Sequence, residues 1–315
     1  VQSHFLDQNT DPQTLVLRAL VALGSSVDEE ELVALLESSF AVWLRQQAGG
    51  PGWDRPALQR DVAALTEGGL LDREPNGHLT LTALGRYAGE SGIEVRSVTQ
   101  VASLMRFGPA TLTTADVIVA AQVTHEMDQT FIPANRRSRQ EQRRWPVMLQ
   151  QLGAHSALQQ GLHVGGGDSF MRTKRAVAVL LFISANPMAA IEQELLQHSR
   201  DRSASGPIRS VAARTRDVID AVCRIAEFSG RSVDSGALNQ EIGVRLEIGL
   251  PAEIAELAQL LGALLSRGEY LALLSSGLTT GDRLLADSLL VEQQLGPSQT
   301  QRVLDRIVSV GNSPT

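Results

Sequence analysis

Cysteine and lysine are almost missing from this chain of 315 residues, which has one of each, Cys223 and Lys174. A single cysteine excludes an intrachain disulfide and a zinc-binding thiolate cluster, so we expect Cys223 to be a buried thiol in a reducing, cytoplasmic setting. A Walker A loop needs a Gly-Lys-Ser/Thr sequence. Because Lys174 stands between Thr173 and Arg175, the chain lacks this phosphate-gripping loop, and we do not expect it to hydrolyse ATP by itself.

Motifs of hydrolytic and metal sites are also missing. Neither a GxSxG turn nor a Cys-His pairing pattern is present, and His125-Glu126 is not followed by the second histidine of an HExxH motif. The remaining histidines, which show no metal-ligand spacing, are His4, His78, His155, His163 and His198. No catalytic residue, metal site or cofactor is therefore predicted for this chain.

Long apolar runs are absent too, since no stretch approaches the length of a membrane span. With 43% hydrophobic residues, the chain can bury one large core or two to three small ones, which predicts a soluble protein of several domains without a membrane partner. The first ten residues, VQSHFLDQNT, have no initial methionine and no basic or apolar region of a signal peptide. We expect the chain to be a fragment of a longer protein.

The formal net charge of −7 is unevenly distributed. Residues 1–92 carry 6 basic and 13 acidic side chains, residues 93–230 carry 16 and 12, and residues 231–315 carry 6 and 10. Attraction to phosphate acts locally, because salt screens charges beyond about 10 Å. A basic strip in the middle third can therefore bind a nucleic-acid strand within an acidic protein.

Residues 1–92 show three helical patterns followed by a hairpin signal, which together predict a winged-helix domain. The β-prone pieces LLDR and HLTLT are joined by EPNG, whose Asn-Gly pair favours a tight turn. In many winged helices the third helix reads bases in the major groove, a role that would fall to Arg55, Gln59 and Arg60. The acidity of this segment instead favours a structural role, in which the domain packs against a neighbour.

Residues 83–230 read as nearly continuous helix, and residues 93–232 are predicted to form a helical bundle. In the helix at 208–228, apolar residues recur at three- and four-residue steps and form one stripe. The stripe consists of Ile208, Val211, Ala212, Thr215, Val218, Ile219, Val222, Ile225 and Ala226. The opposite arc carries Arg209, Ser210, Arg214, Arg216, Asp217, Asp220 and Arg224. Such a helix can bury one face and offer guanidinium groups to a phosphate chain on the other.

The segment NRRSRQEQRRW is the densest basic cluster in the chain. Its residues of interest are Arg136, Arg137, Arg139, Arg143, Arg144 and Trp145. The arginines can track a phosphate backbone, with the tryptophan stacking on a base. A solvated helix face with a half-buried tryptophan accounts for the same pattern equally well. Both interpretations stay open at this point.

Residues 233–315 predict a helix-hairpin-helix-like C-terminal domain. Their helical pattern breaks tightly at 266–269, and a glycine in such a turn lets backbone amides approach a phosphate. Gly268, next to Arg267, offers this freedom. The alternative is an αα-hairpin that only closes the bundle, which the adjacent Glu269 favours.

Four segments, in this order, resemble the region C-terminal to the motor in Ski-two-like superfamily-two helicases, in the DNA-repair branch that includes HelQ and the archaeal Hel-type enzymes. They are LVLRALVALGSSVDEEELVALLESSF, ALTEGGLLDREPNGHLTLTALGRYAGESGIEV, GPIRSVAARTRDVIDAVCRIAEF and LEIGLPAEIAELAQLLGALLSRGEYLALLSSGL. The second is the most specific, because its wing ends in Thr82-Ala-Leu-Gly-Arg86 and leads into an extended, isoleucine-containing segment. The resemblance covers most of the chain.

The resemblance implies a winged helix, a bundle whose ratchet helix touches the translocating strand, and a terminal helix-hairpin-helix domain. The ratchet helix would be the one at 208–228. In that family an arginine and a tryptophan, one heptad apart on this helix, stack on bases, and Ser210 and Asp217 stand at those positions here. The strand would then be held through its backbone by Arg209, Arg214, Arg216 and Arg224.

Two functions follow as hypotheses. The first is a non-catalytic C-terminal region of an ATP-dependent helicase, which guides single-stranded nucleic acid, expected to be DNA, behind RecA-like motor domains. Those domains, with their ATP and magnesium, would lie in an absent N-terminal part or in a separate subunit. The second is a helical interaction scaffold that partners a separate ATPase and has lost strand binding. Ser210, Asp217 and the acidic flanking segments favour the second.

Overall fold

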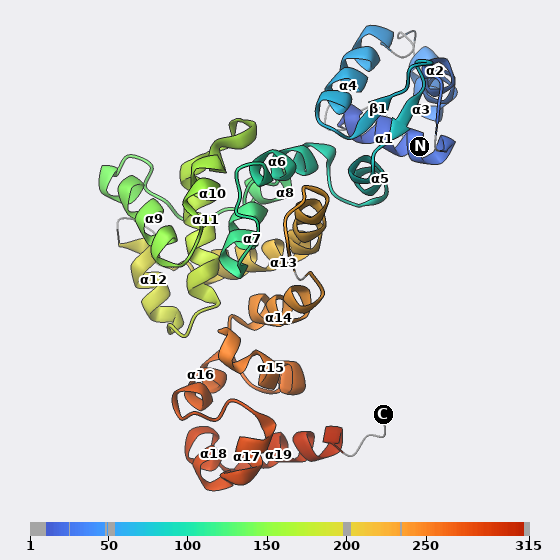
Figure 1. The fold of residues 1–315 in the computed structure, drawn as a ribbon. Coiled ribbons are helices and arrows are strands. Elements are labelled where there is room, and N and C mark those ends of the chain that lie inside the picture. The colour runs from blue at the N-terminus through green and yellow to red at the C-terminus, as the bar shows by residue number, and fades with distance from the viewer. Residues whose placement is uncertain are drawn as a thin grey trace. The chain divides into compact units, whose positions relative to one another are not determined.

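The computed structural model describes residues 11–24, 26–47, 49, 54–197, 203–233 and 235–311. In this part the chain is mainly helical, and its one sheet has two short antiparallel strands (Figure 1). The predicted fold class is confirmed at this level. The chain divides into two compact units, residues 1–106 with 224–230 and residues 107–223 with 231–315. The sequence predicts three domains, and the last two of these fall largely in the second unit.

The first unit is organised around α1 (Pro12–Leu23), which contacts α2, α4, α5 and α6. The Asp11 side chain caps the start of α1, because its carboxylate accepts a hydrogen bond from the Gln13 backbone N–H at 3.2 Å. Pro12, at the first helical position, removes no hydrogen bond of the helix, because the backbone N–H of a residue at this position has no acceptor within the helix. The other helices here are α2 (Glu29–Glu37), α3 (Phe40–Gln47), α4 (Arg55–Glu67), α5 (Ala83–Glu90) and α6 (Val95–Met105).

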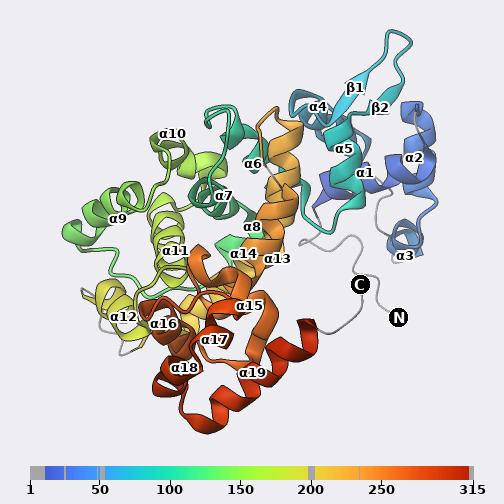
Figure 2. The same cartoon turned by 60° about the horizontal axis from the view of Figure 1, so that its bottom comes forward.

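The predicted hairpin is present in this unit (Figure 2). Strand β1 (Leu71–Arg73) pairs antiparallel with β2 (Leu79–Leu81), and Gly77 in the turn has a φ of 90°. A left-handed φ of this kind favours glycine, so the Asn-Gly prediction of a turn is confirmed. Helix α5 follows directly and packs closely, because a Cβ atom on Gly85 would lie 1.8 Å from the Leu70 carbonyl oxygen.

The second unit has α11 (Ser169–Phe182) as its central helix, which contacts α7, α9 and α12 (Figure 1). Every residue of α11 from Arg172 onward is buried. The other helices of this unit up to residue 223 are α7 (Thr114–Ala121), α8 (His125–Asp128), α9 (Arg139–Gln151), α10 (Ser156–Gln160), a 3-10 helix (Gly161–Gly166), α12 (Met188–Leu196) and the greater part of α13 (Ser205–Phe228), whose residues from 224 onward belong to the first unit.

Helix α11 buries two arginines that share one carboxylate, a group we name the Asp128 cluster: Asp128, Arg172 and Arg175. The Nε and one Nη of Arg172 donate to the Asp128 carboxylate at 3.1 and 2.7 Å, and Arg175 donates to it at 3.0 Å. The remaining N–H groups of Arg172 donate to the carbonyls of Val123, Leu162 and Val164. All five donors of this guanidinium are therefore used inside the protein.

Gly167, the last of the three consecutive glycines at 165–167, packs against this guanidinium. A Cβ atom on Gly167 would lie 2.0 Å from the Arg172 Cζ atom, so only glycine fits there without displacing the arginine. Gly165 and Gly166 have φ values of 68° and 71°, which glycine adopts freely. The loop has a structural use, because the Leu162 and Val164 carbonyls accept from Arg172 and Gly167 leaves room for its guanidinium.

A second buried ion pair joins α11 to α9, and we name it the Glu141 cluster: Glu141, Trp145 and Lys174. The Glu141 carboxylate accepts from Lys174 Nζ, from Trp145 Nε1 at 3.3 Å and from the Asn135 amide at 2.9 Å. Lys174 also donates to the Leu195 carbonyl at 3.0 Å, which adds a contact to α12. The side chains of Glu141 and Lys174 are 1% and 0% exposed, so each charge depends on the other for compensation.

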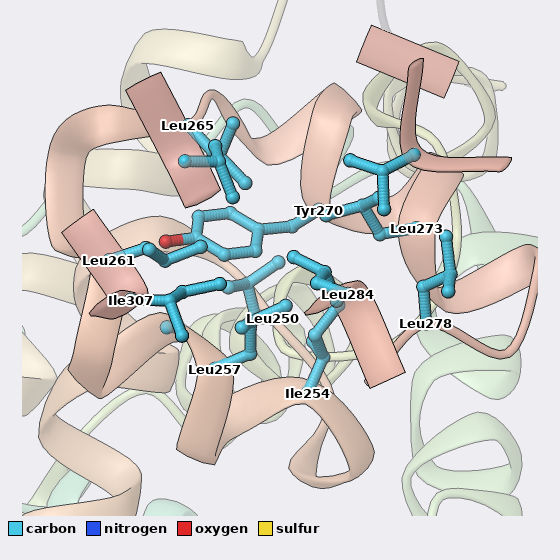
Figure 3. Close-up of a cluster of buried hydrophobic side chains, with 13 residues drawn as sticks. Leu250, Ile254, Leu257, Leu261, Leu265, Tyr270, Leu273, Leu278, Leu284 and Ile307 are labelled. Atoms are coloured by element: carbon cyan, nitrogen blue, oxygen red, sulfur yellow. The ribbon is translucent and has the colours of Figure 1, made fainter. Parts of the chain in front are cut away.

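The last helices gather around the buried ring of Tyr270, next to Leu261 and Leu265 (Figure 3). Its hydroxyl donates to the Gly262 carbonyl at 2.7 Å, and burial raises the pKa of Tyr270. The helices of this segment are α14 (Ser235–Ile248), α15 (Ala255–Leu261), α16 (Arg267–Ser275), α17 (Gly281–Ala286), α18 (Ser288–Leu295) and α19 (Pro297–Gly311), with short 3-10 helices at Ala252–Ile254 and Gly262–Leu264.

Candidate nucleic-acid interface

Helix α13 has the two faces that the sequence predicts. Every residue of the predicted apolar stripe is buried, and Cys223 beside it is buried as well. Thr215 is the polar member of the stripe. Its hydroxyl donates to the Val211 carbonyl at 2.8 Å and accepts from the Gln122 side-chain amide at 3.2 Å. The residues of the opposite arc are all exposed: Arg209, Ser210, Arg214, Arg216, Asp217, Asp220 and Arg224. The predicted amphipathic helix is confirmed.

Two arginines of the exposed arc face the same carboxylate. Arg214 and Arg216 each lie 3.8 Å from Asp217, and Arg216 is also 3.6 Å from Glu247 of α14. The two arginine side chains are 44% and 40% exposed, so water screens the pairs, and each contributes about 1 kcal/mol or less to stability. A phosphate can compete with these carboxylates for the guanidinium groups.

The other two arginines of the arc differ in their surroundings. Arg224 lies 3.4 Å from Glu227, one turn further along the helix. Arg209 makes no ion pair with any carboxylate that the structure describes, and Ser210 beside it is exposed. The pKa of Arg267 is lowered mainly by burial and to a smaller extent by the positive charge of Arg209. Arg209 is therefore the cation of this face most available to a phosphate.

The basic segment before and within α9 is mostly exposed. Its exposed arginines are Arg136, Arg137, Arg139 and Arg143. Arg136 pairs with Asp168 at 2.8 Å, whereas the other three have no carboxylate partner within the described ranges. Arg144 is half-buried and is held by Glu194 and Gln197. This segment therefore has a solvated face of four arginines and one arginine, Arg144, that is bound inside the unit.

The predicted stacking of Trp145 on a base is wrong. The residue is 1% exposed, and its Nε1 donates to Glu141 inside the unit. Its ring is flanked by two cations, since Lys174 Nζ lies 4.8 Å and Arg144 Cζ 5.4 Å from the centroid. A ring enclosed in this way supports α9 from within and cannot face a base.

A hollow with a volume of about 760 Å³ lies on α9 beside the end of α12. Three of the predicted nucleic-acid-binding residues line it, Arg139, Arg143 and Arg144, together with the apolar side chains of Val147 and Met148. Its amide side chains belong to Gln140, Gln151 and Gln197. The sequence does not predict this hollow, because Gln197, which follows the end of α12, is distant from α9 along the chain.

Arg267 holds two parts of the second unit together, which corrects its predicted role as a phosphate ligand. Its Nε and one Nη donate to backbone carbonyls, and its guanidinium lies 5.5 Å from the Phe182 ring centroid. The accepting carbonyls are those of Gly249 at 2.6 Å, Phe182 at 3.1 Å, Ser184 at 3.1 Å and Asn186 at 2.7 Å. These contacts fix the start of α16 to the end of α11.

The turn at Gly268 is not a phosphate cradle, which corrects a second prediction. Gly268 is exposed inside the first turn of α16, where a Cβ atom would meet only the Ser266 hydroxyl at 4.0 Å. The Ser266 amide donates to the Glu269 carboxylate at 2.7 Å, and the Glu269 amide donates to the Ser266 hydroxyl at 3.4 Å. This capping box places a negative charge where a phosphate would bind, so the structure favours the αα-hairpin.

The third helix of the predicted winged helix also has an internal contact. Arg55 at the start of α4 lies 3.4 Å from Glu30 and 3.6 Å from Glu37, both on α2. Gln59 and Arg60 are exposed. The Arg55 side chain is 52% exposed, so these are surface pairs, and the acidity of the segment remains the argument for the structural interpretation of this helix.

Two of the histidines considered above, His4 and His198, lie outside the described residues, as does the segment VQSHFLDQNT. Within the described part, no three or more His, Cys, Asp or Glu side chains are grouped so as to hold a metal ion. No helix in the same part combines the length and the apolar character needed to cross a membrane.

Comparison of the chain with models of known protein families finds no match. Comparison with curated proteins finds no significant match either. The resemblance to helicase C-terminal regions therefore depends on the four segments of the sequence, and any function depends on the geometry of α13 and α9.

Proposed function

We propose that this chain is a non-catalytic C-terminal region of an ATP-dependent superfamily-two helicase, and that it guides single-stranded DNA. RecA-like motor domains, in the same polypeptide or in a partner subunit, would bind ATP and magnesium and hydrolyse the nucleotide. One observation carries the proposal: α13 buries its whole apolar stripe and exposes its arginines.

The order of elements supports the finer fold that this proposal needs. In the first unit α1, α2 and α4 precede the β1–β2 hairpin, and Val27 forms a bridge with Leu79 at the edge of that hairpin. Such an arrangement is compatible with a winged helix. In the second unit α15 and α16 are joined by a 3-10 helix at Gly262–Leu264, which is compatible with a helix-hairpin-helix-like end.

The arginines of α13 suit contact with a strand through its phosphates. From Arg209 to Arg216 the helix rises about 10 Å, so these side chains can reach more than one phosphate. Ser210 and Asp217 offer no aromatic surface for stacking on this face, and binding through the backbone does not depend on sequence. We therefore expect weak, salt-dependent and sequence-independent binding of single strands.

Reversal of three charges on α13 tests the proposal. We expect the variant Arg209→Glu, Arg214→Glu, Arg216→Glu to bind labelled single-stranded DNA at least about 30-fold more weakly than the unchanged chain at low salt, because three phosphate contacts become repulsions. Fluorescence anisotropy at two salt concentrations measures this. The matched control is Arg18→Glu, Arg302→Glu, Arg306→Glu, which changes the net charge equally at exposed positions elsewhere. Equal weakening in both variants would contradict the proposal.

A second candidate function is an interaction scaffold without strand binding, and the position of Asp217 favours it. This carboxylate lies 3.8 Å from both Arg214 and Arg216 and partly neutralises their charges. The variant Asp217→Asn separates the two functions. A strand-binding face should bind single-stranded DNA about 3-fold more tightly without this carboxylate. A scaffold should show no affinity for any oligonucleotide in either form and should co-purify with a partner ATPase.

A further inference from the structure

The hollow on α9 presents a row of side chains that changes in character along the helix. Arg139, Arg143, Val147 and Gln151 follow one another at four-residue steps, so they lie on one face over about 18 Å. Val147 is 56% exposed, although it is apolar. The face therefore offers two cations at one end, an apolar surface in the middle and an amide at the other end.

The described lining of the hollow carries positive charge. Glu141, the acidic residue in the first turn of α9, points inward, where Lys174 neutralises it. Glu194 is occupied by Arg144, and none of the described residues that line the hollow is a carboxylate. The positive end of the α9 dipole lies close to Arg139, the first residue of the helix, and adds to the attraction for an anion.

The remaining lining suits a flat heterocycle. Val147 and Met148 supply an apolar surface, and arginine planes stack on bases in proteins that bind single strands. The side-chain amides of Gln140 and Gln151 each carry donors and an acceptor, which match the polar edges of a base. Gln197 adds amide donors, since its oxygen already accepts from Arg144. A volume of about 760 Å³ lies in the range of small-ligand sites.

We propose that this hollow binds one nucleotide unit, with the phosphate between Arg139 and Arg143 and the base against Val147 and Met148. This site extends the strand binding proposed above. For one of the two possible sources of the nucleotide, the site rests on that proposal. The nucleotide unit can belong to a single strand that also contacts α13, or it can be a free mononucleotide. Both sources present the same phosphate and base.

Calorimetric titration of the whole chain tests this site. We expect deoxyadenosine monophosphate to bind at least about tenfold more tightly than deoxyadenosine or inorganic phosphate, because only the nucleotide supplies both parts. The double variant Arg139→Gln, Arg143→Gln should weaken this binding at least about tenfold, since each arginine contributes a charge-assisted hydrogen bond. The control Arg306→Gln changes an exposed arginine of α19, outside the hollow, and should leave the affinity unchanged.

A short single-stranded oligonucleotide forms the second arm. If the mononucleotide does not bind, but the double variant weakens oligonucleotide binding at least about fivefold, the strand is the source and the site is supported. The site is overturned if the double variant changes neither affinity, or if inorganic phosphate binds as tightly as the nucleotide. The α13 variant should leave mononucleotide binding unchanged, so a failure of strand guiding by α13 remains distinguishable from a failure at the hollow.

Discussion

Replacement of Glu141 by glutamine is expected to reduce the free energy of unfolding of the second unit by about 4 kcal/mol. The carboxylate accepts from Lys174, Trp145 and the Asn135 amide, and its side chain is 1% exposed. Glutamine keeps an acceptor oxygen but removes the carboxylate charge that pairs with the buried ammonium of Lys174. Urea unfolding, followed by hydrogen exchange of α11 peptides, measures the loss in this unit.

A second variant separates loss of charge pairing from general damage to packing. In Glu141→Gln with Lys174→Met the buried cation is also removed, so the double variant should be more stable than Glu141→Gln alone by at least about 1 kcal/mol. If the double variant is the less stable of the two, the pair does not hold α9 to α11 by charge compensation. Glu253→Gln, at an exposed position, is the control and should change stability by no more than about 0.5 kcal/mol.

The second large effect is expected at Asp128, where Asp128→Asn should cost about 3 kcal/mol of unfolding free energy at neutral pH. Arg172 and Arg175 have side chains that are 0% and 3% exposed, and Asp128 is the carboxylate to which both donate. Burial lowers the pKa of Arg175, but a guanidinium still stays charged in proteins. The variant therefore leaves two buried cations facing each other. Asp282→Asn, at an exposed position, should cost no more than about 1 kcal/mol.

The same residue makes part of the stability depend on pH. Burial acts to raise the pKa of Asp128, but the hydrogen bonds and charges of Arg172 and Arg175 outweigh it and hold the pKa below its usual value. A lowered folded pKa means that the contribution is present above the unfolded value of about 3.9 and is lost as the pH falls below it. The difference between the unchanged chain and Asp128→Asn should therefore shrink in acid. A constant difference from neutral to acid pH would contradict this assignment.

The faces of α13 could be predicted from the sequence because local periodicity decides them. Burial at three- and four-residue steps follows from helix geometry alone, and each residue of the stripe from Ile208 to Ala226 is buried as expected. The partners of the arginines could not be predicted in the same way. Glu247 reaches Arg216 from α14, so this pairing depends on how two helices pack.

The buried charges of α11, unlike the faces of α13, could not be predicted from local sequence. Charged side chains are seldom fully buried, so the run Arg172 to Arg175 carries no sequence pattern that predicts its burial. Their counter-charges, Asp128 and Glu141, stand more than thirty residues earlier in the chain and carry no motif that links them to α11. The burial of Trp145 follows from the same packing, which is why its predicted stacking role is wrong.

Salt dependence of strand binding tests the central claim most directly, because each phosphate contact contributes to the slope of log affinity against log salt. With Arg209→Gln, Arg214→Gln and Arg216→Gln, the slope for single-stranded DNA should become less steep by about 2, at about 0.7 for each lost contact. Parallel lines for the unchanged chain and this variant would contradict the claim that the exposed face of α13 holds a strand through its phosphates.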